Sequence, residues 1–112
     1  MNILSYRLPT NTPNPSKHSD CGWVAIVDGK EVGWVNMSFK PDNTLKFEDA
    51  FVHPDFRGLG IYRKLWDTRW EYVSKHYKGW KVVAYCKPLS IDLYKEKQFT
   101  MVEHVVLVEK MI

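Results

Sequence analysis

Hydrophobic and polar residues alternate over several short stretches of this sequence, which is the pattern of β-strands. Such stretches cover residues 2–8, 22–27, 32–39 and 45–52. Asp28 and Gly29 lie in the link between the second and third stretches. An Asp-Gly pair in that place predicts a β-hairpin.

The stretch 45–52 is informative because its two faces differ in character. Strict alternation groups its residues into one face with Lys46, Glu48, Ala50 and Val52 and another with Leu45, Phe47, Asp49 and Phe51. Unless a β-bulge intervenes, Glu48 and Asp49 therefore point to opposite sides of the sheet.

The spacing becomes helical from about Ile61 to Tyr77. Apolar residues recur there at intervals of three and four, at Trp66, Trp70, Val73 and Tyr77. This spacing predicts an amphipathic helix whose aromatic stripe faces the core. Gly79 lies where a helix stop is expected.

The last third of the chain predicts a strand over 80–86, a short helix over about 89–97 and further β-structure over 99–112. The run 80–86 is apolar enough for burial on both faces. The final segment fits either one strand or a tight hairpin. The predicted order β, β-hairpin, β, α, β, α, β is that of a mixed α/β sheet in one domain, residues 1–112.

Composition narrows the functional classes. The chain has 112 residues, of which 45% are hydrophobic, and a net charge of +3, too weak and dispersed to indicate nucleic-acid binding. No apolar run approaches the roughly 20 residues of a membrane helix, and the N-terminus lacks signal-peptide character. We therefore expect a cytoplasmic protein. Two cysteines and four scattered histidines predict no metal site.

The segment VHPDFRGLGI, residues 52–61, carries the clearest chemical signal. Gly58 and Gly60 allow the backbone to curl so that several N–H groups converge, and a helix N-terminus adds further donors. Arg57 supplies a cation suited to phosphate oxygens. Taken alone, the segment fits a phosphate-binding turn and a simple strand-to-helix turn about equally.

Its surroundings favour the phosphate site. The stretch FEDAFVHPDFRGLGIYRKL resembles the strand–loop–helix signature of the GNAT superfamily of N-acetyltransferases, Gln/Arg-x-x-Gly-x-Gly/Ala, which falls on Arg57, Gly60 and Tyr62. Residues 87–99, KPLSIDLYKEKQF, resemble the second signature of the family. The FEDAFV part is similar to the polyamine acetyltransferase branch.

This resemblance implies a GNAT-like fold, with a mostly antiparallel sheet splayed at its central parallel strands, one long and one short helix, and N-terminal helices reduced to a loop. It also implies acetyl-CoA as the acyl donor. The implied cofactor-binding residues are Phe51, Val52, Arg57, Gly58, Leu59, Gly60, Ile61, Tyr62, Arg63 and Ser90.

The sequence departs from the family pattern at several positions. Tyr62 replaces a small residue and is large enough to cover or crowd the pyrophosphate, but both glycines of the turn are intact, so we expect binding to survive. Lys87 stands where Asn is usual, and Gln98 replaces Gly. A proline-rich loop, 9–20, stands in place of two helices. The acceptor cleft is then open, or closed by the substrate or by another subunit, as in a homodimer.

The candidate catalytic residues are Glu48 and Tyr94. Glu48 is suited to general base catalysis, or with Asp49 to binding a cationic acceptor; ordinary surface charge is the alternative. Tyr94 is suited to protonating the departing thiolate, with core packing as the alternative. The predicted function is N-acetyl transfer to a primary amine on a small molecule or a protein. The alternative is a catalytically silent module that binds CoA or a protein.

Overall fold

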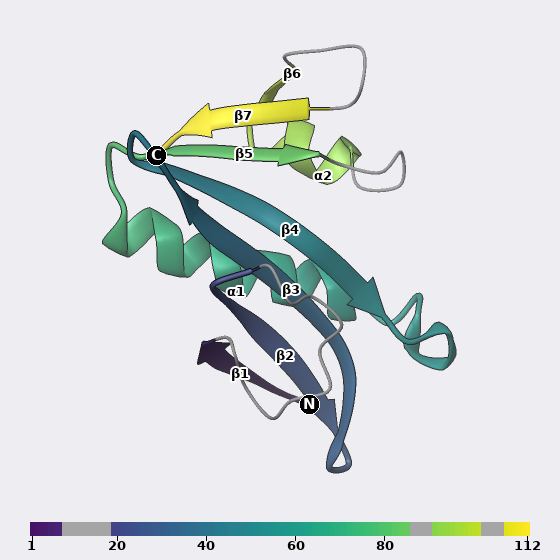
Figure 1. Ribbon diagram of the computed structural model, residues 1–112. Helices are drawn as coiled ribbons and strands as arrows, with labels where there is room; N and C mark the ends of the chain where they lie inside the picture. Colours follow the sequence, from purple (N-terminus) through teal and green to yellow (C-terminus); the bar gives the residue numbers. More distant parts are fainter. Residues whose placement is uncertain (8–18, 86–90, 102–106) are drawn as a thin grey trace.

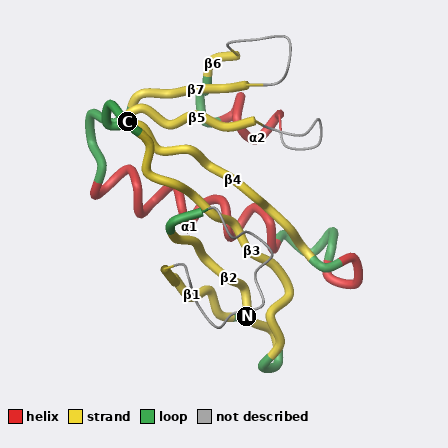
Figure 2. Tube along the Cα trace, in the orientation of Figure 1, coloured by secondary structure: helices red, strands yellow, loops and turns green. Residues whose placement is uncertain are grey.

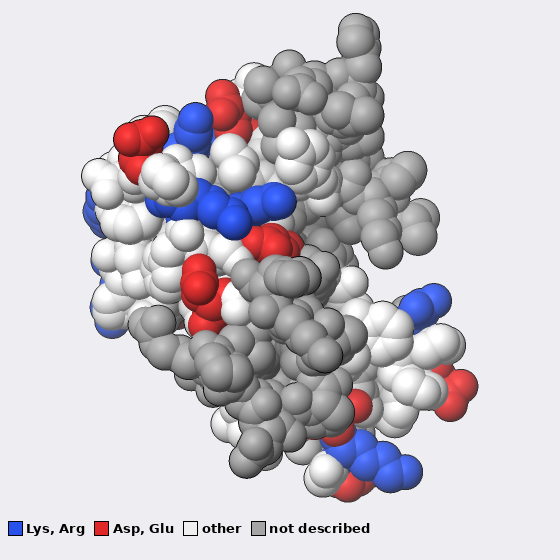
Figure 3. All heavy atoms as spheres, viewed as in Figure 1, with Lys and Arg blue, Asp and Glu red and all other residues white. Residues whose placement is uncertain are grey.

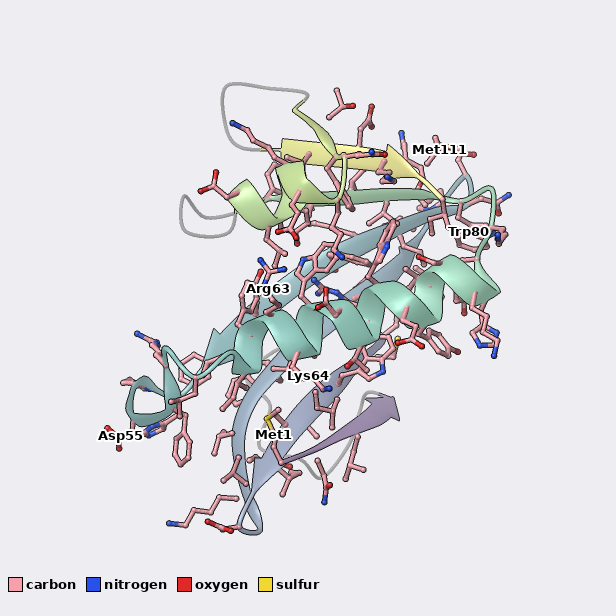
Figure 4. All side chains as sticks on the ribbon, turned by 180° about the vertical axis from the view of Figure 1, so that it is seen from behind. Met1, Asp55, Arg63, Lys64, Trp80 and Met111 are labelled. Atoms are coloured by element: carbon pink, nitrogen blue, oxygen red, sulfur yellow. The ribbon has the colours of Figure 1, made fainter. Side chains whose placement is uncertain are left out.

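The computed structural model describes residues 1–7, 19–85, 91–101 and 107–112. These residues form a sheet in the order β1-β2-β3-β4-β5-β7-β6, with both helices on one side of it (Figures 1 and 4). The strands are β1 (Asn2–Arg7), β2 (Cys21–Val27), β3 (Lys30–Lys40), β4 (Thr44–Val52), β5 (Lys81–Tyr85), β6 (Thr100–Met101) and β7 (Leu107–Met111). The helices are α1 (Ile61–His76) and α2 (Ile91–Glu96). A 3-10 turn (Pro54–Phe56) lies between β4 and α1.

The sheet is splayed at its centre. Strands β4 and β5 are parallel, whereas the other described pairs are antiparallel. Pairing between β4 and β5 runs from Thr44 opposite Lys81 to Phe47 opposite Ala84 and then stops, although β4 continues to Val52. Figure 2 shows the two strands side by side at one end and diverging toward the other. The predicted fold class, including the splay, is confirmed.

The β2–β3 hairpin forms where the Asp-Gly pair predicts it. Val27 lies opposite Lys30, and the two turn residues have positive φ angles, 49° at Asp28 and 77° at Gly29. Positive φ at both central residues is the geometry of a type I′ turn, whose twist matches that of the flanking strands. The predicted hairpin is therefore confirmed.

Helix α1 covers β2, β3 and β4 with its apolar stripe. Trp66 is fully buried and meets the ring of Phe47 on β4 edge-on, with ring centres 6.0 Å apart. Farther along, Tyr72 meets Trp23 of β2 at 5.5 Å. The predicted helix and its aromatic core face are confirmed, and this face of the sheet holds the hydrophobic core. In the described part of the chain, no helix is both long and apolar enough to cross a bilayer.

A β-bulge in β4 overturns the predicted grouping of its residues. The register with β3 shifts by one residue between the Asn36–Glu48 and Trp34–Phe51 pairs, so two β4 residues, 49 and 50, face one residue of β3. Beyond the bulge the alternation reverses. Val52 is buried on the α1 side, whereas Phe51 is exposed on the face of Glu48. The prediction that Val52 shares a face with Glu48 was wrong.

One detail of the C-terminal half differs from the sequence prediction, and another decides between the two alternatives that the sequence left open. Strand β5 is buried on one face only: Val82 and Ala84 are inaccessible, but Tyr85 is 60% exposed. The C-terminal segment contains two strands, β6 and β7, that pair antiparallel. The loop predicted over 9–20 lies outside the described residues except for its last two.

Candidate active site

The RGLG turn connects β4 to α1 at the open end of the splay. Gly58 and Gly60 have φ angles of 79° and 81°, in the left-handed region that glycine tolerates. A Cβ added to either glycine would meet nothing within 4 Å, so the turn has room beside it. Gly60 caps α1 without a side-chain hydrogen bond, which leaves the first N–H groups of the helix available to an anion.

Arg57 ties this turn to the end of β4. Its Nε donates a hydrogen bond to the carbonyl of Val52 at 2.8 Å, and its guanidinium carbon lies 5.9 Å from the ring centre of Phe51. The bond fixes the direction of the side chain but does not use its two Nη groups. A phosphate at the turn would therefore find a positioned, exposed cation.

Arg63, on the first turn of α1, reaches α2. Its two Nη atoms donate to the carboxylate of Glu96 at 3.3 and 3.0 Å, and Figure 4 shows it between the two helices. The hydrogen bonds from Arg63, followed by its charge, lower the pKa of Glu96; the same contacts raise the pKa of Arg63. Both side chains are exposed. Arg63 therefore joins α1 to α2 beside the turn.

Tyr62 is turned toward the protein interior. It is half-buried and packs against the core cluster. It also lies close enough to the buried Arg69 to influence the pKa of that guanidinium. The Tyr62 ring, which replaces the small residue of the motif, therefore packs against the core.

Tyr94 of α2 is 4% exposed and packs edge-on against Trp66 and Phe99, with ring centres 5.4 and 5.0 Å away. Trp66 also contacts the ring of Phe47, which is the last β4 residue that pairs with β5. Tyr94 and Phe47 thus pack against the same tryptophan. The phenol thus belongs to the core on the helix side of the point where the strands part. Ser90, which precedes α2, lies outside the described residues.

Glu48 lies on the opposite face of the sheet. It is half-buried, and its Oε1 atom is buried without a hydrogen-bond partner. On the same face, Trp34 and Phe51 stack at 4.7 Å. The side chain of Asp49, at the bulge, is outside the described set. Leu59 is 68% exposed, Ile61 is buried, and the backbone of both belongs to the turn.

Charges of both signs mark this face. Figure 3 shows a band of Lys and Arg atoms across its upper part, with Asp and Glu atoms directly above and below it. Strands β5 and β7 are joined by an ion pair between Lys81 and Glu109, at 3.5 Å.

Arg69 is a buried cation that the sequence analysis missed. It is 1% exposed, its guanidinium carbon lies 3.8 Å from the ring centre of Phe47, and its Nη1 donates to the carbonyl of Asn36 at 2.9 Å. Burial lowers its pKa, while the phenols of Tyr94 and Tyr62 raise it. Its position was readable, because Arg69 lies four residues after Leu65 and four before Val73, on the apolar stripe.

A family model described as an acetyltransferase (GNAT) domain matches residues 18–101. The chain belongs to the GNAT acetyltransferase family. The resemblance read from the two sequence motifs is thereby confirmed, whereas the nearer likeness to the polyamine branch stays a prediction. Acetyl-CoA, the predicted acyl donor, is the standard donor of GNAT enzymes. No curated protein matches the sequence.

Solved GNAT-like structures share the fold. A protein of Exiguobacterium sp. 255-15 regarded as an acetyltransferase is 12% identical, with a TM-score of 0.72 over 99% of this chain and 94% of that one. The PaiA N-acetyltransferase of Thermoplasma acidophilum is 13% identical, with a TM-score of 0.65 over 81% of this chain and 60% of that one. The GNAT family N-acetyltransferase YhbS of Escherichia coli is 20% identical, with a TM-score of 0.65 over 81% and 58%.

These two N-acetyltransferases were crystallised with coenzyme A. At these identities the likeness establishes the fold alone. This GNAT chain spans about three-fifths of the length of either of them.

Proposed function

We propose that this GNAT chain transfers the acetyl group of acetyl-CoA to a primary amine, on a small molecule or a protein. The proposal rests on one observation above the others. Strands β4 and β5 part after Phe47 and Ala84, the RGLG turn lies at the open end, and Tyr94 lies near the vertex on the helix side. The pantetheine arm would lie between the parted strands.

The residues of the turn fit the pyrophosphate of CoA. The left-handed glycines leave open space, the first turn of α1 offers N–H groups, and Arg57 supplies a fixed cation. We assign cofactor binding to Phe51, Val52, Arg57, Gly58, Leu59, Gly60, Ile61, Tyr62, Arg63 and Ser90. Within this set, Tyr62 and Arg63 would act mainly through their backbone N–H groups, because their side chains are engaged with the core and with Glu96.

Glu48 is the proposed acceptor-side residue. A lysine-like amine has a pKa of about 10.4, so its neutral form costs about 4–5 kcal/mol at pH 7. A carboxylate that takes the proton, directly or through water, offsets part of this cost. The unpartnered Oε1 of Glu48 supports this role. Asp49 would help to bind a cationic acceptor, and the stacked pair of Trp34 and Phe51 would contact its apolar part.

Tyr94 is the proposed general acid. Acetyl-CoA brings a thioester, whose cleavage leaves a thiolate that needs a proton. A phenol is protonated at neutral pH and can donate that proton. A backbone N–H near Val52 would stabilise the oxyanion, an interaction typically worth about 3–4 kcal/mol in the transition state.

Calorimetric titration with acetyl-CoA tests the cofactor site. Gly60→Asp places a carboxylate at the proposed phosphate site and should abolish binding. Gly29→Asp is the matched control, since Gly29 has a similar φ angle, 77°, and equally open surroundings but lies in the β2–β3 turn. Binding that survives in the Gly60 variant, or that both variants lose equally, would show that the turn is not the phosphate site.

Turnover with a panel of amines tests the chemistry. Tyr94→Phe should lower kcat with little change in acetyl-CoA affinity, and Glu48→Gln should act mainly on the step that needs a neutral amine. Normal turnover by Tyr94→Phe would remove the general-acid assignment.

A silent module is the rival, favoured by the fact that Tyr94 packs as a core ring and Arg63 is occupied by Glu96. Acetyl-CoA binding without CoA release from any amine tested would support this rival. The single-domain organisation of residues 1–112, the cytoplasmic location and the homodimer stay predictions from the sequence.

A further inference from the structure

Arg69 carries a permanent positive charge into the core. A guanidinium is not deprotonated in proteins, and burying a charge without a partner is costly. No carboxylate in the described segments forms an ion pair with Arg69. Its charge is balanced in part by the face of Phe47 and by the carbonyl of Asn36.

One end of this guanidinium supports the β4 bulge. The carbonyl of Met37 accepts a bond from the N–H of Asp20, on the β2 side of β3, so the carbonyl of the preceding residue, Asn36, points toward β4. Asn36 lies opposite Glu48, where the bulge disturbs the ladder. The bond from Arg69 therefore satisfies a carbonyl beside the bulge.

The other end has no such partner. Nε and Nη2 of Arg69 are buried and make no hydrogen bond of good geometry. Burial lowers the pKa of the Arg69 guanidinium, and the charge of the nearby Tyr94 phenol opposes this shift. Both side chains also lie near Trp66. The ring centre of Trp66 is 5.9 Å from the guanidinium carbon of Arg69 and 5.4 Å from the ring centre of Tyr94. Arg69 and Tyr94 thus share Trp66 as a neighbour, and two nitrogens of the guanidinium are left without a hydrogen bond.

We propose that Arg69 is a positioning residue for the leaving-group step, holding its charge beside Tyr94 so that the phenol can give up its proton. This inference rests on the proposed acetyl transfer. When the carbon–sulfur bond breaks, its electron pair goes to sulfur, and the Tyr94 proton converts the thiolate to a thiol. The tyrosinate oxygen is then stabilised by Arg69 until it regains a proton, matching the one the amine nitrogen loses. The net products are an amide and CoA.

The positive charge of Arg69 acts strongly on Tyr94 because both side chains are buried. Interactions between charges weaken with dielectric and distance, so a cation in the core acts on a nearby anion more strongly than a surface cation does. Two ion pairs between the α1 and α2 regions, Arg63–Glu96 and Lys97–Asp67, are by contrast partly or largely exposed. Tyr62 is the second phenol near Arg69.

The test compares Arg69→Met, which keeps the length but removes the charge, with Arg69→Lys, which keeps the charge. We expect Arg69→Met to lower kcat by about 10- to 100-fold with the KM for acetyl-CoA changed much less, and Arg69→Lys to retain most of the activity. In a Tyr94→Phe background, Arg69→Met should cause no further loss of kcat. Losses that multiply instead would overturn the proposal and leave Arg69 as a support of the bulge.

A second readout does not depend on activity. The unfolding free energies of Arg69→Met, Tyr94→Phe and the double variant, measured in denaturant, show whether the guanidinium and the phenol interact in the folded protein. We expect the loss in the double variant to differ from the sum of the two single losses, because the two side chains interact. Losses that simply add would overturn the pairing. If the wild type transferred no acetyl group, the proposed function would fail, while this comparison would still decide whether Arg69 acts on Tyr94. Should Arg69→Met not fold, Arg69→Lys and Arg69→Gln provide the same comparison.

Discussion

Gly33 of β3 lies close against the end of β4, and replacing it with alanine tests this packing. A Cβ at this position would lie 2.8 Å from the carbonyl oxygen of Phe51, 3.2 Å from Cγ2 of Val52 and 3.4 Å from Cδ1 of Leu65. The nearest of these atoms belongs to the backbone of a paired strand, so a change of rotamer cannot relieve the contact. The strand itself has to move.

The magnitude follows from two opposing effects. Inserting a methyl group into a packed site costs about 1–3 kcal/mol. Replacing glycine with alanine recovers about 0.4–1 kcal/mol by restricting the unfolded chain. The net loss of unfolding free energy is then about 1–2 kcal/mol, which corresponds to a fall in Tm of roughly 4–8 °C for a domain of this size.

Thermal unfolding followed by circular dichroism measures the stability, and calorimetry measures the affinity for acetyl-CoA. Gly29→Ala is the control, because its Cβ meets nothing within 4 Å and its cost comes from the positive φ angle alone. Gly33→Ala should weaken cofactor binding through the displaced end of β4, whereas Gly29→Ala should not. A Gly33→Ala protein with wild-type Tm and affinity would refute the reasoning.

Three further changes test other parts of the structure. Trp66→Ala should lower the unfolding free energy by about 3–5 kcal/mol in denaturant titrations, because the side chain is fully buried among rings; a loss under 1 kcal/mol would contradict this. Glu96→Gln should lower Tm more at pH 7 than at an acidic pH below the lowered pKa of Glu96. The pKa of Glu96 is lowered by Arg63, so the ion pair stabilises the fold above the ordinary carboxyl pKa of about 4.3 and is lost as pH falls through the lowered value; an equal effect at both pH values would count against it. Arg57→Lys should weaken acetyl-CoA binding despite keeping the charge, because lysine lacks the Nε–H that donates to Val52; unchanged affinity in calorimetry would argue against that bond.

The elements of this fold were predictable where one local pattern determines them. The turn at Asp28 and Gly29 requires positive φ angles, and the stripe containing Trp66 has helical spacing, so the hairpin and α1 follow from short stretches of sequence. The two-motif resemblance gave the family and the splayed sheet. These predictions needed no knowledge of long-range contacts.

The missed features depend on pairs that are distant in sequence. The β4 bulge reverses the faces of Phe51 and Val52, yet the residues on both sides of it have the composition of an ordinary strand. The bond between Arg63 and Glu96 joins residues 33 positions apart. Arg69 could have been found, because an arginine inside an apolar helical stripe is an exception that needs a buried partner.

The short parallel ladder between β4 and β5 is the seam between two halves of the sheet. On one side are β1 to β4, and on the other β5, β7 and β6; within the sheet they are joined over Thr44–Phe47 and Lys81–Ala84. Amide hydrogens along this seam should exchange sooner than those of the β2–β3 ladder, since opening the seam disrupts fewer backbone bonds than global unfolding. A ligand bridging the parted strands would bind only the closed form, and it should slow this exchange as its concentration exceeds its Kd. In this family member the substrate would thus act as part of the structural framework during each turnover.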